Sequence, residues 1–259
     1  MTQIIDSVAA LAQRIHIMQA EQMHGQRLIL AVAGAPGAGK STVAEQLCSM
    51  LNRSEESFAT SASEPLPDSE APHSATLDDQ VGKTGSAHLQ DRSDTVKASV
   101  DTQTSMSEAG SAVVVPMDGF HLDNELLRER GLMAVKGSPQ TFDVDGFVAL
   151  LRRLSVPGDA DVYIPVFDRG ADLARNAASS VSPGHSVIIV EGNYLLLPRP
   201  GWKRLAPLFH LSVMLDVPLQ ILESRLIQRW VDHGLLPEAA RERALSNDIP
   251  NARLVQEES

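Results

Sequence analysis

The chain has 259 residues, of which 43% are hydrophobic and 4% aromatic, so its length and composition suit one large or two small α/β domains with an aliphatic core. Its single cysteine, Cys48, excludes an internal disulfide and favours a reducing cytoplasm. No apolar run reaches the roughly 18 residues of a membrane span, the first residues lack a secretory signal pattern, and the net charge of −11 argues against nucleic acid as a partner.

The first predicted elements are a helix, a buried strand and a second helix. Residues 2–22 carry apolar side chains at three- and four-residue steps, which predicts an amphipathic helix that packs on a sheet or, alternatively, binds a partner. Residues 28–33 are an apolar run, typical of a parallel strand buried on both faces. Residues 42–51 again show helical spacing.

The segment between this strand and the second helix fits the pattern G-x-x-x-x-G-K-[ST] of a P-loop. In that arrangement, backbone N–H groups and the helix N-terminus bind phosphate oxygens. We expect Lys40 to reach the β- and γ-phosphates of a nucleotide and the Ser41 hydroxyl to bind Mg²⁺. The residues expected at the nucleotide are Gly34, Ala35, Pro36, Gly37, Ala38, Gly39, Lys40, Ser41 and Thr42.

Residues 54–110 differ from the rest of the chain in composition. They hold 11 acidic and 3 basic residues, few large apolar ones and no sustained periodicity. Such a segment buries too little apolar area to offset its ordering entropy, which predicts a disordered acidic insertion. A neutral surface expansion and a phosphorylated or partner-binding arm are both open interpretations.

The remaining pattern alternates strands and helices, which predicts one domain over residues 1–259. We expect the α/β fold of P-loop NTPases, with a doubly wound, mostly parallel five-stranded sheet, helices on both faces and a helical lid. The expected strands or extended segments are 113–117, 161–167, 187–190, 211–215 and 252–255. The expected helices are 123–130, 143–154, 220–232 and 237–244.

Two acidic residues follow buried strands at the edge where ligands bind in such sheets. Glu191 follows the strand 187–190 and is expected to hold Mg²⁺ directly or through water, with helix capping as the alternative. Asp118 follows the strand 113–117 and is placed to accept the proton of an attacking hydroxyl group. Because Asp-Gly is also a common turn dipeptide, residue type alone leaves both interpretations of Asp118 open.

Several longer stretches resemble the type I pantothenate kinase, uridine kinase and phosphoribulokinase group of P-loop kinases. The stretches that carry the resemblance are 115–121, 129–143 and 189–193, and together they place it over nearly the whole chain outside 54–110. The resemblance implies that Asp118 is the catalytic base, that Glu191 assists Mg²⁺ and that ATP is the phosphoryl donor.

One stretch departs from the pantothenate kinase pattern. Those kinases carry a Tyr-Ser-His-type stretch after Pro-Val, whereas here Pro165-Val166 is followed by Phe167-Asp168-Arg169. This stretch, with residues 191–197, is more similar to a bacterial nucleoside/nucleotide kinase branch that includes fructose-transport-system-kinase-like proteins. The acceptor therefore stays open among sugars, nucleosides and pantothenate-like molecules.

The candidate acceptor contacts lie near these stretches. Asp168 is suited to sugar hydroxyls and Arg169 to a phosphate or carboxylate, with a surface ion pair as the alternative for both. His121 lies three residues after Asp118, so it is either an acceptor contact or a structural histidine. Asn193 and Tyr194 follow Glu191 and complete the set of expected substrate residues.

The C-terminal helices are expected to form a lid over residues 220–246. Arg225 and Arg229 are four residues apart and share a helix face. Arginines on the matching helix of P-loop kinases close on the phosphates, and the alternative is a solvated face. By position in related kinases, Asn251 and Arg253 are candidates for contacts with adenine.

Taken together, these patterns predict a cytoplasmic kinase that transfers the γ-phosphate of ATP to a hydroxyl group of a small metabolite. Catalysis is assigned to Asp118, Lys40 and Arg229. The alternative is a nucleotide-gated regulatory or accessory ATPase, which would not need Asp118 or Arg169. No nucleic acid or membrane partner is expected, and a homodimer is left open.

Overall fold

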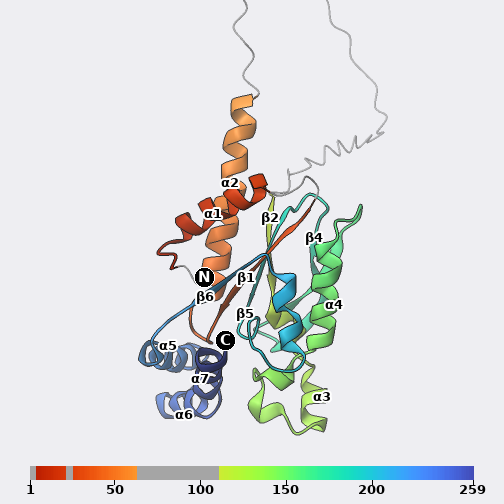
Figure 1. The fold of residues 1–259 in the computed structure, drawn as a ribbon. Coiled ribbons are helices and arrows are strands. Elements are labelled where there is room, and N and C mark those ends of the chain that lie inside the picture. Colours follow the sequence, from red (N-terminus) through yellow and green to blue (C-terminus); the bar gives the residue numbers. More distant parts are fainter. Residues whose placement is uncertain (1–3, 22–25, 63–110) are drawn as a thin grey trace, which may run out of the picture.

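The computed structural model describes residues 4–21, 26–62 and 111–259. Within this part of the chain, the centre is a parallel sheet of four strands in the order β2-β5-β1-β6 (Figure 1). These strands are β1 (Leu28–Gly34), β2 (Ala112–Pro116), β5 (Val187–Gly192) and β6 (Leu211–Leu215). β1 and β5 are buried along their whole length, as their uninterrupted apolar runs predict.

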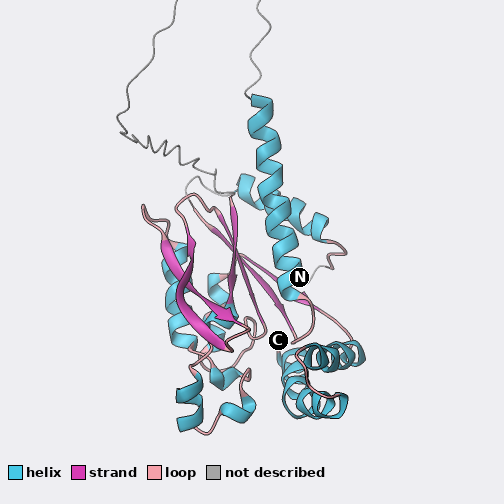
Figure 2. Ribbon diagram, turned by 180° about the vertical axis from the view of Figure 1, so that it is seen from behind, coloured by secondary structure: helices cyan, strands magenta, loops and turns pink. Residues whose placement is uncertain are grey.

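Helices cover both faces of this sheet (Figures 1 and 2). The helices α1 (Val8–Glu21) and α2 (Lys40–Ala62) lie on one side, where Leu11, Ile15 and Leu47 pack with Leu28 and Leu30 of β1. The helix α4 (Val144–Ser155) lies on the other side, and its apolar face packs with alternate residues of β1 and β5. The two clusters together form the aliphatic core that the composition predicts.

A second, two-stranded sheet stands beside α4 on the same side of the molecule (Figure 2). It is an antiparallel hairpin of β3 (Val162–Asp168) and β4 (Leu173–Val181), with a register shift between Ile164 and Val166. Short helical segments join the strands. Between β2 and α4 lie η1 (Met117–Phe120), α3 (Asn124–Glu129), η2 (Met133–Val135) and η3 (Pro139–Thr141). Between β5 and β6 lie η4 (Trp202–Arg204) and η5 (Ala206–Leu208).

The C-terminal part of the chain forms a separate group of helices at the lower end of the sheet (Figure 1). It consists of α5 (Leu219–Asp232), α6 (Pro237–Arg243), the π-helical turn Ala244–Asp248, called the π turn below, and α7 (Ile249–Glu258). The described helices contain none that is long and apolar enough to cross a membrane.

Three expectations about the fold need correction. The described sheet has four strands instead of five, because residues 252–255 belong to α7. Ala252 and Val255 are both buried three residues apart, which is the spacing of one helix face. The strand β4 was missed because its side chains are mostly exposed and lack an apolar pattern. The helix α1 begins at Val8, six residues later than expected, and Ile4 is exposed.

The expected insertion at 54–110 is only partly within the described residues. The helix α2 continues to Ala62, so residues 54–62 are helical instead of disordered. The well-packed first turns of α2 provide the nucleus of the helix. Backbone hydrogen bonds can then continue the helix into residues that lack an apolar pattern. Residues 63–110 lie outside the described residues, and the expectation for them stays a prediction.

Candidate active site

The order of the strands brings the P-loop, Glu191 and Asp118 to one edge of the sheet. β5 lies between β1 and β2, with Ala33 opposite Gly192 and Pro116 opposite Glu191. The P-loop follows β1, and Asp118 lies in η1 directly after β2. The carboxyl ends of parallel strands are where such sheets bind ligands. The three predicted groups therefore lie on neighbouring strands at this edge.

The P-loop makes the tight turn that its glycines predict. Gly37 and Gly39 have φ values of 80° and 92°, in the region that L side chains rarely adopt. Lys40, the first residue of α2, is 8% exposed, and its Nζ donates to the carbonyl oxygen of Ala35 at 3.0 Å. Arg225 of α5 donates to the carbonyl oxygen of Gly37 at 3.1 Å, so the predicted lid helix contacts the loop directly.

Ser41 and Glu191 meet at the start of α2. The Ser41 hydroxyl donates to Oε1 of Glu191 at 3.1 Å, and Glu191 is 6% exposed. Burial raises the pKa of Glu191, the negative charge of Asp118 raises it further, and Lys40 opposes both. Burial lowers the pKa of Lys40, and the charges of Glu191 and Asp118 oppose that shift. Lys40 and Glu191 are therefore close enough to influence each other's pKa, and the charge of Asp118 acts on both.

Asp118 is held in place by a close contact between η1 and β3. A Cβ atom on Gly119 would lie 2.3 Å from the carbonyl oxygen of Pro165, so only glycine allows this approach. Arg169, at the start of the turn after β3, has its Nη2 atom 3.4 Å from Oδ2 of Asp118. The Asp118 side chain remains 27% exposed and accessible from the cavity.

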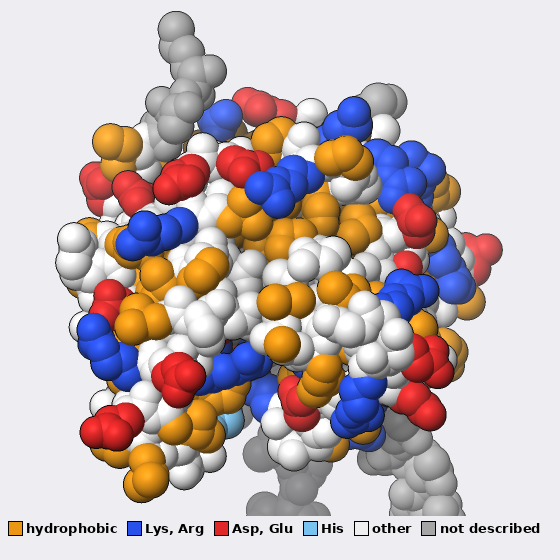
Figure 3. Space-filling view, turned by 90° about the horizontal axis from the view of Figure 1, so that it is seen from below, with side chains coloured by type: hydrophobic (Ala, Val, Ile, Leu, Met, Phe, Trp, Pro, Cys, Tyr) orange, Lys and Arg blue, Asp and Glu red, His pale blue; other side chains and the backbone are white. Residues whose placement is uncertain are grey.

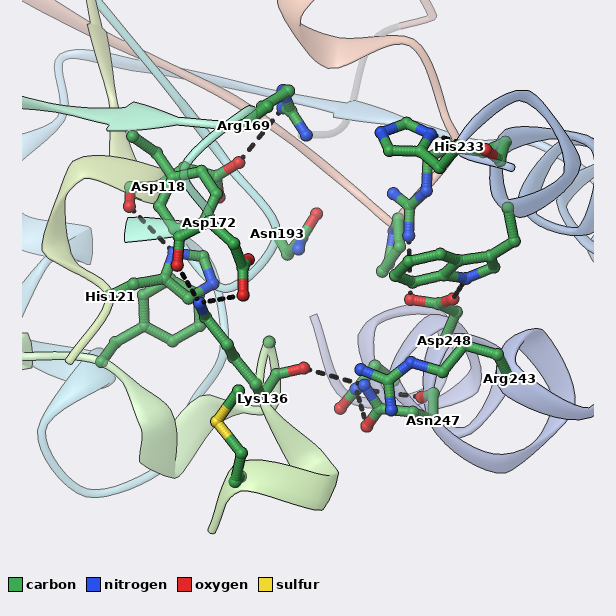
Figure 4. Close-up of a pocket in the computed structure, with 18 of the residues that line it drawn as sticks. Asp118, His121, Lys136, Arg169, Asp172, Asn193, His233, Arg243, Asn247 and Asp248 are labelled. Carbon is green, nitrogen blue, oxygen red and sulfur yellow. Dashed lines mark hydrogen bonds and ion pairs between the residues drawn. The ribbon is translucent and has the colours of Figure 1, made fainter. Parts of the chain in front are cut away.

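A cavity of about 510 Å³ lies between these groups and the C-terminal helices. Figure 4 shows Asp118, His121, Lys136, Arg169, Asp172 and Asn193 on one side, and His233, Arg243, Asn247 and Asp248 on the other. The remaining lining residues are Pro36, Met133, Gly137, Phe142, Phe167, Arg229, Trp230, Leu235 and Asn251. On the lower face of the molecule, basic, acidic and apolar side chains are interspersed, so no single sign of charge dominates that view (Figure 3).

His121 lies between two aromatic rings in the wall of this cavity. Its ring centroid is 4.1 Å from that of Phe142 and 4.7 Å from that of Phe167. Its Nδ1 lies 2.8 Å from the carbonyl oxygen of Asp118, and because a carbonyl only accepts, Nδ1 carries the proton. Burial lowers the pKa of His121, so the ring is neutral at pH 7 and its Nε2 is a hydrogen-bond acceptor.

Lys136 was not among the expected site residues, although it falls within the stretch that carries the family resemblance. Its Nζ donates to Oδ1 of Asn124 and the carbonyl oxygen of Asp172, both at 2.7 Å, and pairs with Oδ2 of Asp172 at 2.9 Å. The ammonium group also lies 5.1 Å from the ring centroid of Phe167. Its three donors are thus used within the protein.

The opposite wall contains a second group of charged residues. Nη2 of Arg229 lies 3.0 Å from Oδ1 of Asp248, and the indole nitrogen of Trp230 donates to Oδ2 of Asp248 at 2.6 Å. The guanidinium groups of Arg229 and Arg243 lie 5.2 and 5.3 Å from the Trp230 ring centroid. Trp230 and Asp248 were not among the expected site residues, because nothing in the local sequence marks their contact.

Some expected site residues are not part of the cavity. Tyr194 is fully buried and its hydroxyl donates to the carbonyl oxygen of Gly137 at 2.6 Å, so it anchors the loop. The Asp168 carboxylate accepts from the backbone nitrogens of Gly170 and Ala171 at 3.0 Å, which caps the turn after β3. Neither residue lines the cavity, and their expected substrate contacts stay predictions. Thr42 and Arg253 are exposed and do not line the cavity.

Asn193 and Asn251 do line the cavity. The Asn251 amide nitrogen donates to the backbone and side-chain oxygens of Asn247 at 3.0 and 3.2 Å. These two bonds do not use the side-chain oxygen of Asn251. Its expected contact with adenine stays a prediction.

Comparison with known proteins places the chain in a family. No family model matches it. "ATP-dependent kinase-like protein notR'" of Aspergillus versicolor is 36% identical over 145 residues, which cover 52% of this chain and 84% of that protein. "Putative uridine kinase C227.14" of Schizosaccharomyces pombe is 28% identical over 239 residues, which cover 90% of this chain and 80% of that protein.

The solved structures agree with these relatives. The crystal structure of a "putative fructose transport system kinase" from Silicibacter sp. TM1040 is 36% identical and superposes with a TM-score of 0.71, covering 97% of this chain and 95% of that one. The fold and the relatives together define a P-loop kinase. The chain belongs to this kinase family, in the group that includes uridine-kinase-like and fructose-transport-system-kinase-like proteins, and it is a phosphotransferase.

Proposed function

We propose that this kinase transfers the γ-phosphate of ATP to a hydroxyl group of a small metabolite. The name of the Aspergillus versicolor relative supports ATP as the donor. The observation that carries the proposal is the position of Asp118, which lines the cavity and acts electrostatically on both Lys40 and Glu191. A carboxylate at the position of Asp118 would face both the phosphates of bound ATP and the space for an acceptor.

The donor half of the site fits ATP with Mg²⁺. The loop 34–41 and Lys40 would hold the β- and γ-phosphates. The Ser41 hydroxyl and the Glu191 carboxylate, 3.1 Å apart, are oxygen ligands of the kind that Mg²⁺ prefers. Among the described residues there is no cluster of three or more His, Cys, Asp or Glu side chains that would hold a metal by itself. This suits an ion that shares its coordination with phosphates and water, and that neutralises phosphate charge when bound.

The transfer step assigns a role to one residue on each side of the cavity. Asp118 accepts the proton of the acceptor hydroxyl as its oxygen forms a bond to the γ-phosphorus, and the bond to the bridging oxygen breaks to release ADP. Arg229, on the opposite wall, stabilises the negative charge of the phosphoryl group during transfer. Arg169 pairs with Asp118 at 3.4 Å and orients its carboxylate.

The acceptor wall suits an acceptor with several hydroxyl groups. Lys136 uses its donors on Asn124 and Asp172, and Arg169 pairs with Asp118 through one nitrogen. The Asp118 carboxylate and Nε2 of His121 are hydrogen-bond acceptors on this wall. Hydroxyl donors satisfy such groups, whereas a substrate carboxylate repels them. The names of two relatives refer to uridine and fructose, which both carry several hydroxyl groups.

The decisive experiment measures ADP release from Mg-ATP against a panel of sugars, nucleosides, pantothenate and glycerate. We expect a sugar or nucleoside to stimulate turnover in the unchanged protein and to be recovered in phosphorylated form. Slow turnover that no acceptor stimulates and that Asp118→Asn leaves unchanged would overturn the proposal. That result would favour the nucleotide-gated ATPase instead.

A further inference from the structure

The carboxylate of Asp248 is the centre of an unusual arrangement on the lid side of the cavity. Asp248 ends the π turn and is only 7% exposed. Its two oxygens have different partners, since Oδ1 accepts from Arg229 and Oδ2 from the Trp230 indole. A buried carboxylate with both oxygens bonded has a fixed orientation, and its charge-assisted bonds are the strong ones. The Asp248 carboxylate is therefore fixed relative to Arg229 and Trp230.

The Asp248 carboxylate holds the guanidinium group of Arg229. Its side chain is 36% exposed and lines the cavity, so it is accessible to a ligand. One nitrogen, Nη2, bonds Asp248, and the plane lies 5.2 Å from the centre of the Trp230 ring. A guanidinium group has five N–H donors, so a single bond to Asp248 leaves other donors for a phosphate. Its positive charge also acts on Lys40 of the P-loop.

The π turn also reaches the acceptor side of the cavity. Asn247, the residue before Asp248, is 5% exposed and donates to the carbonyl oxygen of Lys136 at 2.8 Å. Arg243, directly before the turn, donates to the carbonyl oxygen of Ala134 at 3.1 Å. π turns within helices are rare and are often found at functional sites. Asn247 contacts the acceptor wall and the next residue, Asp248, contacts Arg229. The π turn therefore fixes the distance between that wall and Arg229.

We propose that Asp248 is a positioning residue for phosphoryl transfer, which holds the Arg229 guanidinium at the distance from the acceptor wall that transfer requires. This inference rests on the proposed function and extends it to a residue that acts on transfer through Arg229. Loss of the Asp248 charge leaves Arg229 present but no longer fixed. Because a fixed charge is worth more at the transition state than in ground-state binding, kcat should fall more than ATP affinity.

A double-mutant cycle separates positioning from a general structural role. Asp248→Asn keeps the size of the side chain and removes its charge, and we expect kcat to fall about 10- to 100-fold while the Kd for Mg-ATP changes less than about threefold. In an Arg229→Ala background, Asp248→Asn should lower kcat by less than about twofold, because its target is already gone. Asp232→Asn, the same change at a carboxylate bonded to Gln228 on α5, is the matched control and should have no effect.

A second measurement does not depend on the acceptor. The indole nitrogen of Trp230 bonds Asp248, and its ring lies beside Arg229, so its fluorescence should change when Mg-ATP binds. The signal is assigned by comparison with Trp230→Phe, which retains the other tryptophan, Trp202. We expect a nucleotide-dependent change that Trp230→Phe abolishes and Arg229→Ala strongly reduces. Trp230→Phe also removes the indole bond to Asp248, so it should lower kcat and serves as the second variant if Asp248→Asn does not fold.

The outcomes distinguish this inference from the proposed function. Additive effects of Asp248→Asn and Arg229→Ala, or equal losses in kcat and ATP affinity, would overturn the positioning role while acceptor-stimulated turnover stands. If no acceptor stimulates turnover, the cycle is measured on basal ATP hydrolysis together with the fluorescence response. Non-additivity there supports the positioning of Arg229 even where the proposed acceptor chemistry fails.

Discussion

The two halves of the cavity are built in opposite ways. The donor half is a run of eight consecutive residues, Gly34–Ser41, between β1 and α2. The acceptor and lid walls instead combine side chains from η1, the loop after α3, the β3–β4 turn, the end of β5, α5 and the π turn. The loop needs only local backbone geometry, whereas the walls depend on contacts between distant segments.

This difference indicates where the specificity of the kinase lies. The P-loop binds a polyphosphate through backbone groups and one lysine, which any nucleoside triphosphate satisfies. The walls carry the groups that differ in chemistry, such as His121 between its aromatic neighbours and Asp172 paired with Lys136. Changes in the two halves should therefore have separable effects on ATP and on the acceptor.

The largest expected effect comes from Asp118→Asn. The substitution preserves size but removes the proton acceptor, so kcat for acceptor phosphorylation should fall about 10²- to 10⁴-fold. Binding of Mg-ATP, measured by calorimetry, should change little because the donor half is intact. Asp159→Asn, at an exposed carboxylate, is the control. Equal loss of ATP binding would show that the halves are not separable.

Lys40→Ala breaks the donor half instead. We expect turnover to fall about 10²- to 10³-fold with any acceptor, because a preorganised positive charge is lost at the phosphates. ATP affinity should fall as well, in contrast to Asp118→Asn. The exposed Lys203→Ala provides the comparison. Normal ATP binding and turnover in Lys40→Ala would remove the P-loop from the mechanism.

A smaller effect is expected from a substitution at Tyr194, which contacts the acceptor wall from the core. Tyr194→Phe removes the hydroxyl that donates to the carbonyl oxygen of Gly137. Because this bond is only partly buried, its loss should cost about 0.5–1.5 kcal/mol in the free energy of unfolding, which denaturant titration measures. Since residue 194 itself does not line the cavity, KM for the acceptor should rise while ATP affinity stays constant. Tyr163→Phe, at an exposed tyrosine of β3, should change neither. Unchanged stability in Tyr194→Phe would show that this hydroxyl does not anchor the loop.

The smallest expected effect is a pH dependence of stability at Glu191. Burial, followed by the charge of Asp118, raises the pKa of this carboxyl above its ordinary value of 4.5. Its ionisation therefore costs more in the folded than in the unfolded state, and stability is lost as pH rises from that value through the raised pKa. Glu191→Gln does not ionise, so its melting temperature should match the unchanged protein near pH 4 and exceed it near pH 8. A lower melting temperature for Glu191→Gln at the higher pH would contradict this.

Local patterns predicted what depends on local geometry. The P-loop motif, the strands β1, β2, β5 and β6, and the acids at the ends of β2 and β5 were all expected from residue type and spacing. Their common location follows from one rule, that parallel strands end at the same edge. The helices expected at 220–232 and 237–244 correspond to α5 and α6, and their role as a lid stays a prediction.

Local patterns do not predict contacts between distant parts of the chain. Tyr194 lies three residues after Glu191, yet it is buried in the core and bonds Gly137, 57 residues away in the chain. Only the packing of α5 against the π turn brings Asp248 to Arg229. The segment 252–255 is apolar and short, so its pattern did not separate a strand from a helix.

The path of the chain through the sheet has a consequence for how such kinases diversify. The chain leaves the sheet after Pro116 and returns at Val187 on the adjacent strand, and β2 and β5 stay paired throughout. The intervening residues carry most of the acceptor wall but none of the P-loop. Residues 117–186 thus form one crossover segment whose two junctions lie on adjacent strands, at opposite ends of the sheet. Recombination between relatives at these junctions could replace the acceptor preference and leave the nucleotide chemistry of the recipient intact.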